Sequence, residues 1–158
     1  VVTGSGKTGY VARGDSDGNY IEPVTSTGSV AISGDGFKTT GSNLMCEPDI
    51  SVSEVLKKAS GATIKNASGK TVTSGNLGTG YTIKYNGTTY TVVKLGDTNG
   101  DGKSTPADST VVLRAYVGLE GISNAERKAA DTNGDGKFTP ADSTVILRAY
   151  VGLQNIEI

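Results

Sequence analysis

The chain has 158 residues, of which 35% are hydrophobic, 23 are glycine and none is tryptophan. So few large apolar side chains do not favour one large core, and we expect two small modules instead. The formal net charge of −1 argues against a nucleic-acid partner bound through its phosphates. No apolar run approaches the ~20 residues that a membrane span needs.

Residues 1–27 are rich in Gly, Ser and Thr and show little periodicity. They are compatible with a linker, or with one or two extra strands near Tyr10–Val11 and Tyr20–Ile21, and the sequence leaves this choice open. The chain begins Val1-Val2-Thr3 without a start Met. We therefore expect a segment of a longer protein and do not expect to find a targeting signal within it.

Residues 28–95 are expected to form a small β-rich module with one short helix. Ser51 and Glu54 have the spacing of a capping box, which predicts a helix over 52–60 that is closed by Gly61. Cys46 is the only cysteine, which excludes an intramolecular disulfide. Proteins without disulfides are typical of reducing compartments, but a metal ion can stabilise a small module in their place, so secretion stays open.

Strand-like segments follow the helix at 62–66 and 70–73, and a hairpin is predicted over 81–85 and 88–95. Asn86-Gly87 favours the type I′ turn that this tight connection needs. In that register one face of the hairpin carries the core side chains Tyr81, Ile83, Tyr85, Tyr90 and Val92.

The opposite face of the hairpin is polar except at Val93 and Leu95. Only Gly96 separates this strand from the acidic segment that follows, which is too short for a flexible linker. We therefore expect the second module to cover Val93 and Leu95 and to be joined rigidly to the first.

The clearest feature of the chain is an internal repeat with a period of 34 residues. Residues 97–120 and 131–154 are identical at 21 of 24 positions. The charge also changes here, because residues 1–95 carry a net charge of +2 and residues 96–158 a net charge of −3. The acidic, repeated part is where we expect a bound cation. The three differences are Ser104/Phe138, Val112/Ile146 and Glu120/Gln154.

Each repeat begins with Asp-Thr-Asn-Gly-Asp-Gly-Lys, so that oxygen-bearing side chains occupy positions 1, 3 and 5 of a loop that closes with Asp at position 12. Calcium prefers six to eight oxygen ligands, and this spacing predicts two Ca2+ ions, one in each loop. The carbonyl at position 7 and the Thr at position 9, acting through water, complete the set. The predicted ligands are Asp97, Asn99, Asp101, Lys103, Thr105 and Asp108 in the first loop, and Asp131, Asn133, Asp135, Lys137, Thr139 and Asp142 in the second.

The second half of each loop also starts a helix. Thr105 is placed as an N-cap, with Pro at the first helical position and Asp108 at the third, and the second repeat does the same. Each helix is expected to run about twelve residues to a Gly-Leu end such as Gly118-Leu119. Between the repeats, Ser123 and Glu126 form another capping box and predict a helix that leads into the second loop.

This loop–helix, helix–loop–helix order resembles the dockerin family, the calcium-binding modules by which bacterial extracellular enzymes attach to cohesin domains on scaffolding proteins. The resemblance covers residues 96–158 and rests on the two DTNGDGK…D loops and the LRAYVGL helices. Ser104 departs from the aliphatic residue usual at loop position 8. Residues 28–95, which end GTGYTIKYNGTTYTVVKLGD, look like the small X-type modules that often precede dockerins.

The resemblance implies an α+β chain, with a β-rich X-like module and an all-α dockerin of two half EF-hands. It implies a calcium-dependent docking module, not an enzyme, that anchors a secreted bacterial protein to a cohesin domain of a scaffoldin. The setting implied is an extracellular polysaccharide-degrading complex such as a cellulosome or amylosome, attached to the cell surface through the scaffold. The unbound module is expected to be a monomer. Histidine is absent, and no Ser or Cys has a base nearby in sequence, so triad-type catalysis has no support.

The repeated helices carry more apolar residues than one buried face needs. Val112, Tyr116 and Leu119 follow i, i+4, i+7 spacing and are predicted to be the core stripe. A helix that is apolar on more than one face is either fully buried or binds a partner, and a small module favours the partner. The expected partner-binding residues are Ala107, Val111, Leu113, Arg114 and Val117, and their counterparts Ala141, Val145, Leu147, Arg148 and Val151.

Two other functions stay open. One is a carbohydrate-binding module with a structural calcium domain, in which Tyr81, Tyr85 and Tyr90 would stack on sugars, although strand tyrosines on one face are more often core. The other is a calcium sensor or surface-protein stabiliser without a cohesin partner. Sensors change shape around full two-helix hands, which the half-hands of this chain do not provide.

Overall fold

The computed structural model describes residues 13–14, 20–21 and 31–158, and the chain divides into the units 1–30 and 31–158. In the first unit, strand β1 (Arg13–Gly14) pairs antiparallel with β2 (Tyr20–Ile21). The strand expected at Tyr20–Ile21 is therefore present. The one expected near Tyr10–Val11 lies outside the described residues.

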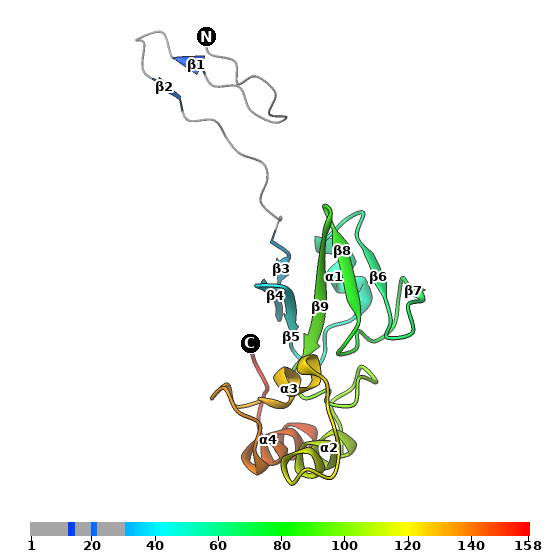
Figure 1. Cartoon of the computed structure of the whole chain (residues 1–158), viewed down its shortest axis with the longest axis vertical. Coiled ribbons are helices and arrows are strands. Elements are labelled where there is room, and N and C mark those ends of the chain that lie inside the picture. The colour runs from blue at the N-terminus through cyan, green and yellow to red at the C-terminus, as the bar shows by residue number, and fades with distance from the viewer. Residues whose placement is uncertain (1–12, 15–19, 22–30) are drawn as a thin grey trace. The chain divides into compact units, whose positions relative to one another are not determined.

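The first part of the second unit is built on a seven-stranded sheet with the order β3-β4-β5-β9-β8-β6-β7 (Figure 1). Neighbouring strands pair antiparallel except β5 and β9, which are parallel. The first three strands were not predicted from the sequence. The strands are β3 (Ser33–Gly34), β4 (Phe37–Thr40), β5 (Asn43–Cys46), β6 (Thr63–Lys65), β7 (Thr71–Val72), β8 (Thr82–Tyr85) and β9 (Thr88–Lys94).

The hairpin of β8 and β9 has the register that the sequence predicts. Asn86 and Gly87 have φ angles of 48° and 80°, as a type I′ turn requires, and Ile83 lies opposite Tyr90. Both of these side chains are buried in the sheet core.

Helix α1 (Val52–Lys58) covers this core and begins at the predicted capping box. The Ser51 hydroxyl accepts from the Glu54 amide, and the Glu54 carboxylate accepts from the Ser51 amide. The helix ends two residues earlier than expected, with Ala59 as its C-cap. The buried core of the module consists of Ile32, Phe37, Leu44, Cys46, Ile50, Val52, Val55, Ala59, Ile64, Leu77, Ile83, Tyr90 and Val92.

Three helices follow the sheet: α2 (Pro106–Tyr116), α3 (Asn124–Ala130) and α4 (Pro140–Tyr150). All three begin at the predicted N-cap residues, Thr105, Ser123 and Thr139. Figure 1 shows α2 and α4 side by side and α3 next to the end of β9. The unit is thus α+β, and no described helix is long and apolar enough to cross a membrane.

The sheet and the helices share a second core at the end of β9. Leu95 is buried there among side chains of α2, α3, α4 and the C-terminal segment, and the Gly96 amide donates to the Ala129 carbonyl (2.8 Å). Val93 is also fully buried. The helical part therefore covers Leu95 as expected. The buried members of this core are Leu95, Val112, Ala130, Ile146 and Ile156.

Candidate functional site

The first loop, residues 97–108, is wrapped by short side-chain-to-backbone hydrogen bonds. The Asn99 side-chain oxygen accepts from the Asp101 amide, and the Asp101 carboxylate accepts from the Lys103 amide (both 2.9 Å). Asp108 closes the loop, because one of its oxygens accepts from the Thr98 amide (2.9 Å) and the other from the Thr105 amide (2.9 Å). The end of the loop is thereby held against its beginning.

Asp97, the first predicted ligand, is fully buried. Its Oδ2 accepts from the Gly102 amide (3.0 Å), but its Oδ1 is buried without a hydrogen-bond partner. Burial raises the pKa of the Asp97 carboxyl to about 6, and the neighbouring carboxylates Asp108 and Asp101 add to this rise. Burial also raises the pKa of Asp108. A buried oxygen without a partner costs about 1–3 kcal/mol, and a bound cation would supply the missing partner.

The second loop, residues 131–142, repeats these contacts within itself. Asp131 accepts from the Asp135 amide (3.0 Å) and the Gly136 amide (2.8 Å). Asp142 accepts from the Asn133 amide (3.1 Å) and the Thr139 amide (2.7 Å) and is fully buried, like Asp108. The local sequence therefore produces the same fold twice.

The oxygen donors of these loops suit calcium in chemical type. Carboxylates, amide oxygens and backbone carbonyls are hard ligands, and the unpartnered Oδ1 of Asp97 fits a cation ligand. In the described part of the chain, however, no three His, Cys, Asp or Glu side chains are gathered as a metal cluster. Asp101 and Asp135 instead direct a carboxylate oxygen to an amide of their own loop.

Thr79 and Lys94 of the sheet module donate hydrogen bonds to the first loop, and sequence reasoning did not identify them. The Thr79 amide donates to Oδ2 of Asp97 (2.8 Å). The Lys94 ammonium donates to the Gly102 carbonyl (2.9 Å) from a side chain that is only 1% exposed. Burial lowers the pKa of Lys94, against the opposing effect of Asp97. The sequence signal for a buried lysine was the position of Lys94 between the apolar residues Val93 and Leu95.

Helices α2 and α4 expose matching apolar side chains on the side away from the shared core. Leu113 and Leu147 are 42% and 43% exposed, and Val117 and Val151 are 64% and 65% exposed. Ala107, Arg114, Ala141 and Arg148 are also exposed, whereas Val111 and Val145 are half-buried. Most of the residues expected to bind a partner are thus accessible, in two nearly equal sets.

The predicted core stripe of these helices is wrong in part. Val112 is fully buried, but Tyr116 is 54% exposed and Leu119 is 73% exposed. The buried face of α2 instead consists of Asp108, Ser109 and Val112, in the first two turns. Asp108 is buried because it closes the loop, and Ser109 is buried because it contacts α4. The buried face therefore lies near the start of α2, and the last turn extends beyond the core. Its apolar residues enlarge the exposed surface.

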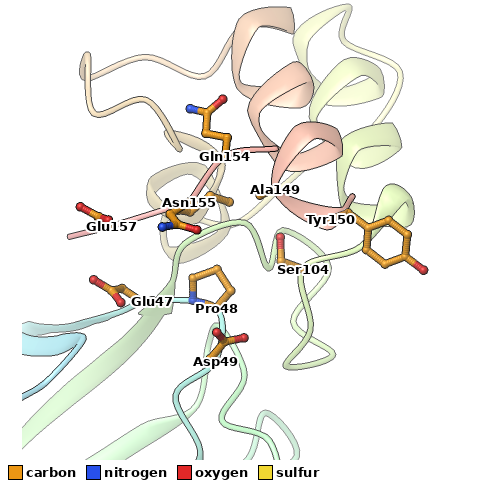
Figure 2. Close-up of a pocket in the computed structure, with 10 residues that line it drawn as sticks. Glu47, Pro48, Asp49, Ser104, Ala149, Tyr150, Gln154, Asn155 and Glu157 are labelled. Atoms are coloured by element: carbon orange, nitrogen blue, oxygen red, sulfur yellow. The ribbon is translucent and has the colours of Figure 1, made fainter. Parts of the chain in front are cut away.

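Ser104 and Phe138, which differ between the repeats, are not among the exposed apolar side chains of α2 and α4. Ser104 lines a pocket of about 460 Å³ between the segment after β5 and the end of α4, where Glu47, Asp49 and Glu157 also lie (Figure 2). Phe138 packs against the shared core, and the Arg127 guanidinium lies 5.5 Å from its ring centroid. Neither residue is one of those expected to bind the partner.

Comparison with protein families gave a match to the second part of the chain. Residues 95–150 match the model of the dockerin type I domain, which supports a dockerin in this part. Dockerins in general bind calcium, dock onto cohesin domains and are not catalytic. The comparisons with curated proteins and with solved structures gave no match.

Proposed function

We propose that residues 96–158 are a calcium-loaded dockerin that binds a cohesin domain of a scaffolding protein through the exposed faces of α2 and α4. One observation carries this proposal: two repeats present the same apolar side chains, Leu113 with Val117 and Leu147 with Val151, to solvent at nearly equal exposure. A small module has no reason to leave both sets uncovered unless a partner covers them.

Calcium would be held by the two loops, one ion in each, with Asp97 and Asp131 as the first ligands. The buried Oδ1 of Asp97 without a partner supports this for the first loop. The second loop has the same donor types at the same spacing. A bound ion would supply positive charge to buried carboxylates and fix the start of the helix that each loop caps.

The contacts with the partner would be made by the residues predicted from the sequence. Arg114 and Arg148 stand beside the exposed leucines and would add charged hydrogen bonds at the edge of the surface. Interfaces of this kind concentrate their energy in a few central side chains, each worth about 2 kcal/mol or more. We place that centre at Leu113 and Val117, or at Leu147 and Val151.

We further propose that the parent protein is secreted by a bacterium and acts on a polysaccharide, in a complex of the cellulosome or amylosome kind. The dockerin match supports an extracellular bacterial setting, and the substrate is our inference from the family resemblance. Residues 28–95 would be an X-like module that precedes the dockerin. The unbound protein would be a monomer.

The carbohydrate-binding alternative loses its main argument. Tyr90 is 2% exposed, and Tyr81 and Tyr85 are partly buried against the sheet core. These three rings therefore do not form an open platform for stacking on sugars. Within residues 31–158 the most exposed tyrosines, Tyr116 and Tyr150, lie on the helices next to the proposed cohesin surface.

The test is capture of the protein on a panel of immobilised cohesin domains, in calcium and in chelator. We expect binding to at least one cohesin in calcium, and loss of that binding in chelator. Leu113→Asp/Leu147→Asp should abolish it, while Thr63→Asp, an exposed change on β6, should leave it unchanged. Capture by none of the cohesins, or equal capture in chelator, would contradict the proposal.

A further inference from the structure

The two loops have nearly the same sequence but different surroundings. Seven consecutive residues from Asp97 and from Asp131 are identical. Asp131, however, is only half-buried and receives its hydrogen bonds from the amides of Asp135 and Gly136 in its own loop. Asp97 is fully buried and receives one of its two from Thr79, eighteen residues earlier in the chain.

Backbone packing shows the same difference. A Cβ added at Gly102 would lie 2.7 Å from the Asn76 Cβ, and one added at Gly100 would lie 3.1 Å from the Thr79 carbonyl oxygen. The corresponding positions in the second loop, Gly134 and Gly136, have open space around them. The segment before β8 therefore encloses the first loop, and nothing among the described residues encloses the second at these two glycines.

Lys94 adds charge to this enclosure. Its ammonium is buried and donates to the Gly102 carbonyl (2.9 Å), at the sharp turn of the loop. Thr79 is tied to the same strand, because its hydroxyl donates to the Lys94 carbonyl (3.2 Å) and accepts from the Lys94 amide (3.1 Å). The sheet module thus brings an amide and a positive charge to a loop that contains three carboxylates. In the absence of a cation this charge opposes the repulsion between them.

We propose that Thr79 and Lys94 are positioning residues that hold the first loop folded before a cation binds, so that the two calcium loops respond unequally to removal of calcium. The second loop, whose first Asp accepts hydrogen bonds only from amides of its own loop among the described residues, depends on the ion for its order. The first loop does not. This inference rests on the proposed calcium sites. It assigns to the sheet module the positioning of the first of them.

Hydrogen exchange of two matched amides tests the proposal. Gly102 and Gly136 each stand between Asp and Lys, so their intrinsic exchange rates are equal, and each donates to the first Asp of its loop. In chelator we expect the Gly136 amide of the wild-type chain to exchange at least about tenfold faster than that of Gly102. Added calcium should slow Gly136 strongly and Gly102 much less.

Lys94→Met removes the ammonium and keeps the length of the side chain. In chelator it should speed exchange at Gly102 towards the rate at Gly136, while the amide of Val92 in β9 stays protected. A merely structural role would lower protection at Val92 and Gly102 together. Lys84→Met, an exposed change on β8, should alter none of these amides.

The inference is overturned if chelator exposes Gly102 and Gly136 equally in the wild-type chain, or if Gly136 does not respond to calcium. It is also overturned if Lys94→Met leaves Gly102 unchanged or exposes Val92 to the same extent. The exchange rates of Gly102 and Gly136 in the wild-type chain test the proposal even if Lys94→Met does not fold. Cohesin capture in calcium decides the proposed docking function separately, so either result can fail without the other.

Discussion

Ser109 and Ser143 meet with their hydroxyls hydrogen-bonded to each other in the buried contact between α2 and α4. They are separated by 34 residues, one period of the repeat, and therefore occupy the same position in each copy. A residue that touches its own counterpart lies next to a local two-fold axis, as in a symmetric dimer interface. This contact is the one expected of α2 and α4 if a rotation of about 180° relates the two repeats.

This contact predicts a pattern in stability. Ser109→Ala leaves the Ser143 hydroxyl buried without a partner and should lower the free energy of unfolding by about 1–2 kcal/mol. Ser143→Ala should do the same. The double variant should cost clearly less than the sum of the two, because it leaves no unpaired hydroxyl. Urea denaturation in calcium measures all three, and additive effects would show that the two hydroxyls do not act as a pair.

Removal of calcium should unfold only part of the chain. A site formed only in the folded state converts binding energy into stability, so chelator should lower the helical circular dichroism of α3 and α4. The sheet of residues 31–95, with its own buried core, should stay folded. Readdition of calcium should restore the signal. A helical signal that is unchanged in chelator would refute the coupling of metal binding to folding.

Each loop should account for one ion. Asp131→Ala should reduce calcium binding in calorimetric titration from two ions to one and weaken cohesin binding, because the helix start at Thr139 loses its anchor. Asp97→Ala should do the same for the first loop. Asp35→Ala, an exposed carboxylate between β3 and β4, is the matched control and should leave two ions bound. Retention of both ions in Asp131→Ala would remove it from the ligand set.

The Leu95 side chain should stabilise the contact between the sheet and the helices. Leu95→Ser removes a side chain buried among Val112, Ala130 and Ile146 and should lower the free energy of unfolding by about 2–5 kcal/mol. Relaxation measurements should then show looser coupling between sheet and helices, with calcium still bound. Independent tumbling of the two parts in the wild-type chain would show that the shared core does not hold them together.

Local chemistry made much of this structure predictable. The capping boxes at Ser51, Thr105 and Ser123 need residues only three apart, and the turn at Asn86-Gly87 needs only two, so neighbouring residues decide them. The calcium loops are also local, because a run of twelve residues carries all the predicted donors. The helix starts and the Asn86-Gly87 turn form in the structure where the sequence predicts them.

What could not be predicted depends on distant pairing. Strand β5 lies parallel to β9, 48 residues away between the partners Asn43 and Thr91, and its short sequence shows no alternation of apolar and polar residues to reveal it. The burial of Lys94 depends on the same packing. Tyr116 was misplaced in the core because periodicity does not show how far along α2 its neighbour extends.

The final prediction follows from the two-fold relation of α2 and α4. A rotation of about 180° exchanges Leu113 and Arg114 with Leu147 and Arg148. The two leucines are almost equally exposed. A partner is then offered two surfaces of nearly equal energy. Ser104 and Phe138 do not belong to these four residues, because Ser104 lines the pocket of Figure 2 and Phe138 packs against the shared core.

One difference between the surfaces remains at their edge. Arg114 forms an ion pair with Glu120 (3.1 Å), whereas the residue equivalent to Glu120 in the second repeat is the neutral Gln154. An exposed ion pair is worth about 0–1 kcal/mol, so it would bias the choice of orientation by no more than roughly fivefold. Glu120→Gln should make the two surfaces more nearly equal.

Variants in pairs test whether both orientations are used. Leu113→Asp/Arg114→Asp and Leu147→Asp/Arg148→Asp should each leave cohesin affinity within about tenfold of the wild type, since the other surface still binds. All four substitutions together should abolish binding. Circular dichroism in calcium should confirm that each variant is folded, because all four side chains are exposed. If one pair alone abolishes binding, the partner uses a single orientation. The sheet module, which encloses only the first loop, would then be the part of the chain that breaks the symmetry.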